Sequence, residues 1–154
     1  MAGTPFTVHV QGTYAAANRQ CLVEIIPAAN HPIVIRSIEY TEGGTSGTDP
    51  RTLVESKIGG TVAASGTAGS EASIVKGEPD HSLTLQTTVR GLFPNATLPT
   101  ATNEIEGPFG GRGDPQRGLA KWVGYQRIKE GTIFRIYVTP PATNTYTLKV
   151  LGEE

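Results

Sequence analysis

Two runs of aliphatic and β-branched residues near the N-terminus constrain the fold of this chain most strongly. The runs are Cys21–Ile26 and Ile33–Tyr40, and the segment between them is Pro-Ala-Ala-Asn-His-Pro. Branched apolar residues favour strands, whereas proline and asparagine favour turns. The whole stretch, Gln20–Thr41, therefore predicts two strands that pair with each other across a short loop.

Further strands are expected along the rest of the 154 residues. Apolar and polar residues alternate in short windows, and no window has the period of an amphipathic helix. Strands are predicted at 6–10, 51–58, 82–90, 119–125, 133–138 and 146–150. The 19 glycines and 11 prolines punctuate many short elements.

This pattern predicts one all-β domain over 1–154, built from about eight strands with long loops. We expect an antiparallel two-sheet β-sandwich of the jelly-roll kind. A small barrel has the same periodicity, but eight strands with a few long crossings suit a jelly roll better than an up-and-down barrel.

The charge balance gives no sign of a nucleic-acid or membrane partner. The formal net charge is −1, with both signs interspersed, so no basic footprint for DNA, RNA or anionic lipid is expected. The N-terminus lacks the pattern of a secretory signal, and no apolar run is long enough to span a bilayer. Cys21 is the only cysteine, so a disulfide within the chain is impossible, and we expect a buried thiol.

No local motif predicts a catalytic, cofactor or metal site, and we expect a protein that is not an enzyme. His9, His31 and His81 are far apart in the sequence, and no cysteine or carboxylate joins them at the spacing of metal ligands. His31 is expected to stabilise its turn. Convergence of the three histidines in the fold would revive a metal site.

The segment 91–118 is rich in proline and glycine and is expected to be a long contact loop. It contains Arg112-Gly113-Asp114, a tripeptide that resembles integrin ligands. We interpret it as a glycine-rich tip whose charges, with Arg117, are solvated or paired across a subunit contact. Trp122 beside Val123 and Tyr125 favours the core or a subunit interface over a sugar-stacking platform.

One part of the sequence resembles a known group of proteins. The run EIIPAANHPIVIRSIEYTEGGTSGT, together with Val138-Thr139-Pro140-Pro141 and the terminal Glu153-Glu154, is similar to small β-rich proteins encoded in the head gene clusters of tailed bacteriophages. The similarity covers roughly the first 60 and the last 20 residues. The segment Gly91–Gly118 departs from it.

The resemblance implies a jelly-roll capsid decoration, or cement, protein of the virion, made in the host cytoplasm. Such a protein assembles as a homotrimer and binds the major capsid protein on the outer shell. We expect contacts from an extended N-terminal arm, 1–10, and from the 91–118 loop. Candidate contact residues are Phe6, Val8, Phe93, Phe109, Arg112, Asp114, Arg117 and Trp122. The alternative is a phage tail or fibre component, or a lectin-like carbohydrate-binding module.

Overall fold

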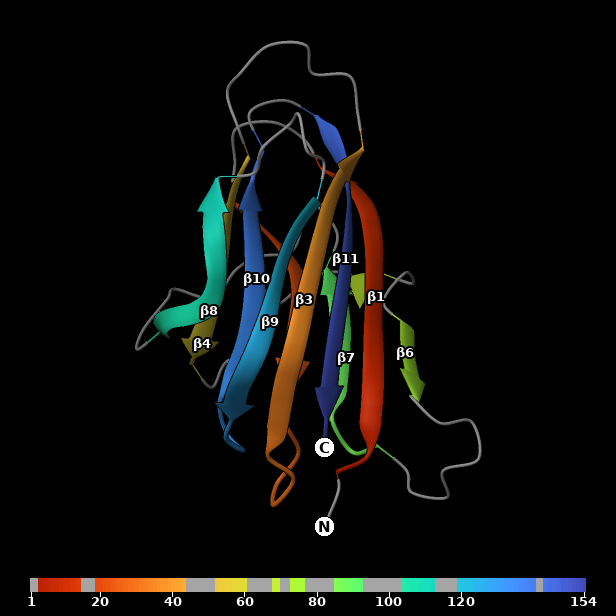
Figure 1. Ribbon diagram of the computed structural model, residues 1–154, viewed down its shortest axis with the longest axis vertical. Helices are drawn as coiled ribbons and strands as arrows, with labels where there is room; N and C mark the ends of the chain where they lie inside the picture. Colours follow the sequence, from red (N-terminus) through yellow and green to blue (C-terminus); the bar gives the residue numbers. More distant parts are fainter. Residues whose placement is uncertain are drawn as a thin grey trace.

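The computed structural model describes residues 3–14, 19–43, 52–60, 68–69, 73–76, 85–92, 104–112, 119–140 and 143–154. Eleven strands are assigned within these residues, and no helix is found there (Figure 1). The strands are β1 (Pro5–Tyr14), β2 (Gln20–Ile26), β3 (Ile33–Gly43), β4 (Leu53–Gly59), β5 (Ala68–Gly69), β6 (Ser73–Lys76), β7 (Thr88–Leu92), β8 (Glu104–Arg112), β9 (Leu119–Ile128), β10 (Ile133–Thr139) and β11 (Asn144–Glu153).

The strands form two antiparallel sheets packed face to face. The five-stranded sheet has the order β6-β1-β11-β3-β9, and the six-stranded sheet has the order β5-β7-β2-β10-β4-β8. Without β5, β6 and β7, the two sheets hold four strands each, and the chain changes sheet between nearly all consecutive strands. This is the order of a jelly roll. The prediction of an all-β, antiparallel two-sheet sandwich of the jelly-roll kind is confirmed, with eleven strands in the described residues where about eight were expected.

The three remaining strands lie between β4 and β8 in the chain and extend both sheets. Strand β6 pairs with β1 in the five-stranded sheet. Strands β5 and β7 extend the six-stranded sheet beyond β2. These strands widen the two sheets on one side of the sandwich only. On the opposite side, β8 and β9 are the edge strands.

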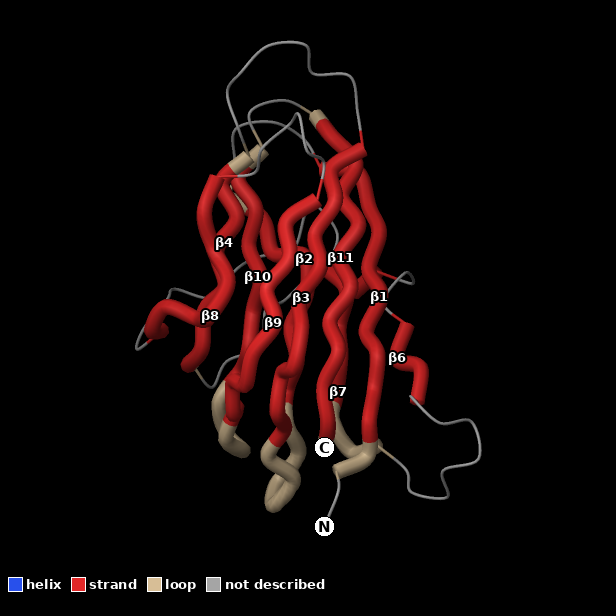
Figure 2. The backbone as a smooth tube through the Cα atoms, in the orientation of Figure 1, coloured by secondary structure: helices blue, strands red, loops and turns tan. Residues whose placement is uncertain are grey.

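The predicted pairing of the two central strands is wrong. Strand β2 pairs with β7 and β10, whereas β3 lies in the other sheet and pairs with β9 and β11. The connection 27–32 is an arch between the sheets, which lie about 10 Å apart in such sandwiches. Its turn is formed by Ala29 and Asn30, and Asn30 adopts a φ of 63°, a conformation that asparagine tolerates. The described connections 27–32 and 129–132 lie at the same end of the sandwich as the chain's C-terminus (Figure 2).

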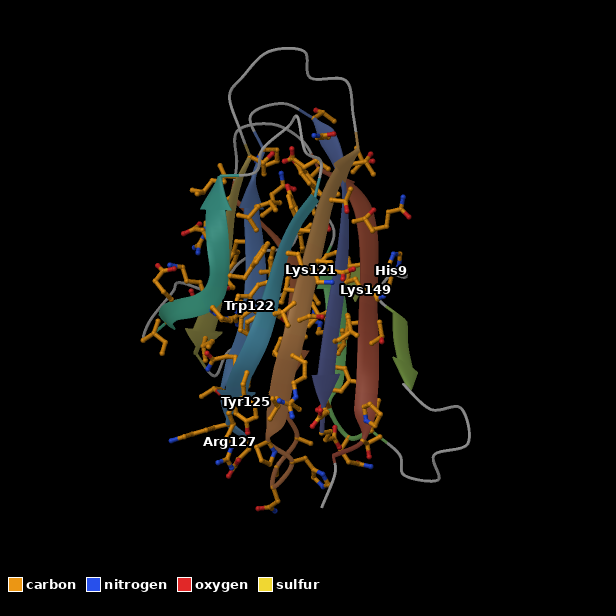
Figure 3. The ribbon with its side chains drawn as sticks, in the orientation of Figure 1. His9, Lys121, Trp122, Tyr125, Arg127 and Lys149 are labelled. Atoms are coloured by element: carbon orange, nitrogen blue, oxygen red, sulfur yellow. The ribbon has the colours of Figure 1, made fainter. Side chains whose placement is uncertain are left out.

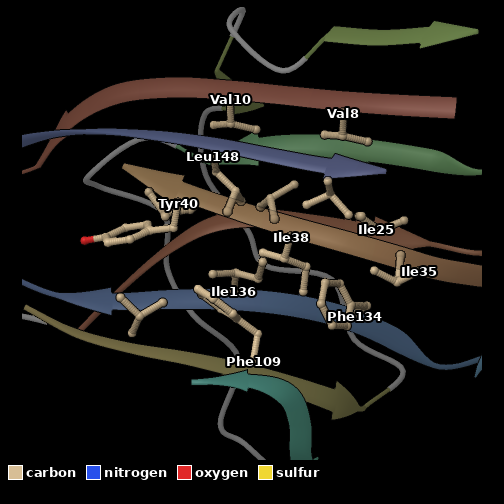
Figure 4. Packing of buried hydrophobic residues seen from close by; sticks show 14 of the residues in the cluster. Val8, Val10, Ile25, Ile35, Ile38, Tyr40, Phe109, Phe134, Ile136 and Leu148 are labelled. Carbon is tan, nitrogen blue, oxygen red and sulfur yellow. The ribbon is translucent and has the colours of Figure 1, made fainter. Parts of the chain in front are cut away.

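The core fills the space between the sheets (Figure 4). On β1, Phe6, Val8 and Val10 point inward and are at most 2% exposed. They meet aliphatic and aromatic side chains of both sheets, including Ile25 and Phe134. Burying each such side chain contributes about 1.5–3 kcal/mol. The predicted N-terminal arm is therefore wrong for the described residues 3–10, because β1 is an interior strand between β6 and β11.

Two other boundaries differ from the predictions. The expected strand at 82–90 is replaced by β7, which begins at Thr88, and residues 85–87 precede it without strand pairing. The expected loop at 91–118 contains the end of β7 and all of β8, and β9 begins directly after it, at Leu119. Residues 93–103 and 113–118 lie outside the described part of the chain.

Candidate functional site

The long edges of both sheets lie on one side of the sandwich. Strand β8 has 9 residues and β9 has 10, whereas the edges on the other side, β5 and β6, have 2 and 4 residues. Strands β8 and β9 contact each other, and Figure 1 shows both at the left of the view. Long edge strands offer unpaired N–H and C=O groups for another chain to bind. We call this region the β8–β9 side.

The β8–β9 side also carries the large apolar side chains that are most exposed among the described residues. Among the described residues, the large hydrophobic side chains that are well exposed are Ile105 (65%), Val123 (68%) and Tyr125 (62%). Ile105 belongs to β8, and the other two belong to β9. Scattered exposed hydrophobics are ordinary, but these three lie on the two edge strands of one side, which makes the β8–β9 side a candidate interaction surface.

Strand β9 has a bulge where it passes Arg36 of β3. Ser37 pairs with Val123 and Ile35 with Gln126, so two residues of β9 stand opposite Arg36. The Arg36 guanidinium lies over the Tyr125 ring, 4.8 Å from its centroid. Arg36 also donates two hydrogen bonds to Glu153, at 3.0 and 3.2 Å, which raise the pKa of its guanidinium. The exposed Tyr125 ring is thus held in place on the outer face of the sheet (Figure 3).

Trp122 points the other way, toward the core. Its indole is partly buried and packs against the core cluster. It also lies over Gly124, where an added Cβ would be 2.5 Å from the ring. A glycine at this position lets the indole close the side of the sandwich. The prediction that Trp122 belongs to the core or to an interface fits this position better than a sugar-stacking platform does.

Strand β8 is tied to its sheet by side-chain bonds. The Ser56 hydroxyl donates to the Phe109 carbonyl and accepts a hydrogen bond from the Phe109 amide at 2.9 Å. Lys57 pairs with Glu106, which raises the pKa of the lysine ammonium. These bonds fix the edge that presents Ile105.

A row of charged residues crosses the outer face of the six-stranded sheet. In register, Arg90 of β7 stands beside Glu24 of β2, followed by Arg135 of β10 and Lys57 of β4. Arg135 donates to Glu24 at 2.8 Å and to Glu104 at 2.6 Å. Burial acts to lower the pKa of Arg135, but its hydrogen bonds to both carboxylates outweigh this effect and raise it. The row cross-links neighbouring strands.

The side chains of Tyr137 and Cys21 lie beside this row on strands β10 and β2. Tyr137 donates to Glu104 at 3.0 Å, and the Arg19 guanidinium lies 3.8 Å from the centre of its ring. Cys21 is buried and donates to the Val23 carbonyl. Burial, with the nearby Glu24 charge, raises the pKa of the Cys21 thiol. A nucleophile or metal ligand needs the thiolate, so the arrangement holds Cys21 as a neutral core residue.

The structure corrects three of the predicted contact residues. Phe6, Val8 and Phe109 are 2%, 0% and 8% exposed, so their side chains form core rather than surface contacts. These three residues were predicted to make contacts because they are apolar, but apolar side chains are equally typical of the core. Phe93, Asp114 and Arg117 lie outside the described residues, as do Gly113 and the side chain of Arg112.

The histidines that are described do not come together. His9 is exposed on the outer face of β1. The backbone N–H of His31 donates to the Ala28 carbonyl within the turn, whereas the side-chain Nδ1 lies 3.3 Å from Oε1 of Glu154. His81 lies outside the described residues. Within the described ranges, no group of three or more histidine, cysteine or acidic side chains is placed to hold a metal ion.

Ile105, Val123 and Tyr125 were not among the predicted contact residues. The segment Leu119–Tyr125 has a usable signal, since Trp122 and Val123 are apolar neighbours and must face opposite sides of a strand. An edge strand that is apolar on both faces is a candidate contact element. That β9 is an edge follows only from the topology.

Comparisons with protein-family models, curated proteins and solved structures found no match for this chain. Across the described residues, no helix is long and apolar enough to cross a membrane.

Proposed function

We propose that this chain is a non-enzymatic structural protein of a virion, which binds the outer surface of a bacteriophage head as an oligomer and stabilises it. The observation that carries the proposal is the β8–β9 side, where two long edge strands present Ile105, Val123 and Tyr125 to solvent. Such a surface serves assembly with other chains through strand pairing and apolar burial.

The scaffold behind this side also supports the proposal. Its two sheets are joined by a continuous apolar core, and the buried row around Arg135 links adjacent strands. A clamp between capsid subunits must transmit force without deforming, and close-packed interiors have low compressibility. The sequence resemblance to phage decoration proteins supplies the partner, the major capsid protein.

Binding to phage heads tests this proposal directly. Heads purified without their decoration protein, from the virus that encodes this chain, are mixed with the purified protein and sedimented. Saturable co-sedimentation and a higher temperature of head disruption are expected. Absence of binding under conditions in which the protein is folded would reject the capsid role.

The exposed ring of Tyr125 favours one alternative, a carbohydrate-binding module of a tail or fibre. Sugar rings stack on exposed aromatic faces, and Tyr125 is 62% exposed. Arg36 already covers part of one face of this ring. The capsid proposal also accounts for the exposure of Ile105 and Val123, which sugar stacking on Tyr125 does not. Saturable binding on a glycan array that is lost in Tyr125→Ala would favour this alternative.

A further inference from the structure

We infer that the outer face of the five-stranded sheet docks on an acidic protein surface, through Val123, Tyr125 and Arg127 of β9 and Lys149 of β11. The inference rests on the proposed function, because it takes the surface of the phage head as the partner. It adds which face of the sandwich lies against that partner and which chemistry the partner presents. Three properties of this face support it: its exposure, its excess of positive charge and its exposed apolar residues.

The two outer faces of the sandwich differ in what they offer to a partner. In the six-stranded sheet, the central strands β2 and β10 are buried at every residue except the last, so both of their faces are covered. In the five-stranded sheet, buried residues of β1 and β11 alternate with residues that are exposed or half-buried. Only the outer face of the five-stranded sheet is therefore open across its central strands.

Arg127 and Lys149 point outward on this open face, as Val123 and Tyr125 do. Each of the two cations is next in sequence to core residues, and neighbours in a strand point to opposite sides. These core residues, all 0% exposed, are Ile128, Leu148 and Val150. Figure 3 shows Arg127 close to Tyr125 on β9, with Lys149 farther up on β11. The four residues thus share one face of one sheet.

This face carries more positive than negative charge. The charged side chains that point outward from β1, β3, β9 and β11 are four cations and two carboxylates: Arg36, Lys121, Arg127 and Lys149, with Glu39 and Glu153. The formal net charge of the whole chain is −1. The positive excess is therefore a local property of this face, and it attracts acidic partners.

The two carboxylates on this face are already bonded within the chain. Glu39 pairs with Lys121 at 2.7 Å, and Lys121 and then Lys149 lower the pKa of this carboxyl. The other carboxylate accepts the two hydrogen bonds of Arg36. Arg127 and Lys149 form no ion pair with any described residue. These two cations are left for carboxylates of a partner.

The apolar residues of this face favour a protein over other acidic partners. Val123 is 68% exposed, and its isopropyl group is stabilised only by burial against other apolar groups. A glycan could stack on Tyr125 but would leave Val123 uncovered. A nucleic acid brings closely spaced phosphates, which the two carboxylates of this face repel. Tyrosine and arginine, by contrast, are enriched among the residues that dominate protein interfaces.

The Tyr125 ring is also held in place before any partner binds. The Arg36 guanidinium lies 4.8 Å from its centroid, and the ring is still 62% exposed. A side chain that is ordered in advance loses less conformational entropy on binding. The expected partner surface therefore has an apolar centre, which covers Val123 and Tyr125, and carboxylates at its border, which meet Arg127 and Lys149.

Variants of the face test the inference from the side of this chain. Phage heads purified without their decoration protein are mixed with each variant and sedimented. Tyr125→Ala and Arg127→Gln are each expected to lower the affinity for heads at least tenfold, and Lys149→Gln by a smaller factor because Glu39 lies beside it. Arg19→Gln is the matched control, since it removes one positive charge next to the six-stranded sheet, and it should bind like the wild type.

Circular dichroism and thermal melting confirm that each variant is folded. Wild-type affinity in both Tyr125→Ala and Arg127→Gln would overturn the inference, as would an equal loss of affinity in Arg19→Gln.

Neutralising the heads tests the chemistry of the partner. Heads treated with a water-soluble carbodiimide and ethanolamine lose the charge of their surface carboxylates, and we expect them to bind the wild type at least tenfold more weakly. Heads with acetylated lysines are the control and should bind at least as well as untreated heads. Electron microscopy confirms that the treated heads are intact. Full binding to carboxylate-neutralised heads would rule out an acidic partner surface.

The two proposals can be told apart by their failures. If heads bind the wild type and every face variant equally, the capsid role stands and the docking face fails. If heads do not bind the folded protein, both proposals fail. Binding of an acidic glycan or of single-stranded oligo-dT that is lost in Tyr125→Ala would then assign this face to a different class of partner.

Discussion

Arg135 and Glu24 form an ion pair in which both side chains are buried, at 1% and 0% exposure, with Nε and Oε1 2.8 Å apart. They lie on the neighbouring central strands β10 and β2 of the six-stranded sheet, 111 residues apart in the sequence. Glu104 of β8 and Arg90 of β7 extend the pair to both sides. One guanidinium therefore joins strands from distant parts of the chain.

Arg135→Leu is expected to destabilise the protein strongly. The change leaves Glu24 and Glu104 without their main counter-ion in a buried site. Removing one partner of a buried ion pair costs about 3–5 kcal/mol, so the melting temperature should fall by roughly 6–20 °C for a chain of this size. Chemical denaturation followed by circular dichroism measures the loss.

Arg36→Leu is the matched control for that change. Arg36 also pairs with a glutamate, Glu153, but its side chain is 45% exposed, and exposed pairs contribute little. We expect a much smaller loss of stability than in Arg135→Leu. Equal losses in the two variants would show that burial of the Arg135 network does not matter.

Stability should fall at alkaline pH. Burial raises the pKa of the Cys21 thiol above 9.0 and, with the Glu42 hydrogen bond, that of the Tyr40 hydroxyl above 10.0. Burial raises the pKa of Tyr137 in the same way. The unfolded chain releases these protons at lower pH than the folded chain, so it binds fewer protons and is favoured as pH rises. The contribution is complete below pH 9 and decreases above it by up to about 1.4 kcal/mol per pH unit for each group.

Urea denaturation at several pH values measures this dependence, and tyrosinate absorbance at 295 nm reports ionisation. Tyr137→Phe removes one of the titrating groups and should make the alkaline slope shallower. A stability that stays constant well above pH 10, or an unchanged slope in Tyr137→Phe, would contradict the assignment.

The alternation of residues predicted most individual strands but not their partners. Phe6, Val8 and Val10 point inward as the pattern indicates, because a half-buried strand encodes its own faces. Which strand lies beside which is decided by contacts between distant segments. The apolar runs of β2 and β3 fit pairing with each other equally well, and only the complete jelly roll places them in different sheets.

Predicting the candidate site from the sequence would have required the same information on contacts between distant segments. An apolar residue such as Phe109 or Val123 has the same sequence signature in the core and at an edge. Phe109 is buried because Ser56 and the neighbouring strand β4 hold it against the core. Val123 is exposed because it lies on the outer face of β9, opposite to the inward-pointing Trp122. The Glu24 charge within an apolar run marked an unusual position, but its partner Arg135 could not be identified from spacing.

Ser56→Ala should loosen β8 without unfolding the sandwich. The Ser56 hydroxyl bonds both the amide and the carbonyl of Phe109, and losing it leaves buried backbone groups unsatisfied at a cost of about 1–3 kcal/mol. Amide hydrogen exchange should accelerate in β8 more than in β10. Thr147→Ala, on β11 of the other sheet, is a suitable control, and equal acceleration in every strand would indicate a global effect instead.

Gly124→Ala tests how the open side of the sandwich is closed. A Cβ at residue 124 would lie 2.5 Å from the Trp122 ring, so the indole must move away from the core, and overpacking of this kind costs about 1–3 kcal/mol. Trp122 is the only tryptophan, so its fluorescence maximum should shift to longer wavelength as the ring becomes more exposed. Gly110→Ala on β8 is the control, because its nearest contact, the Val54 carbonyl oxygen at 3.4 Å, leaves room for a methyl group. An unchanged emission spectrum in Gly124→Ala would mean that Trp122 does not depend on this glycine for its position.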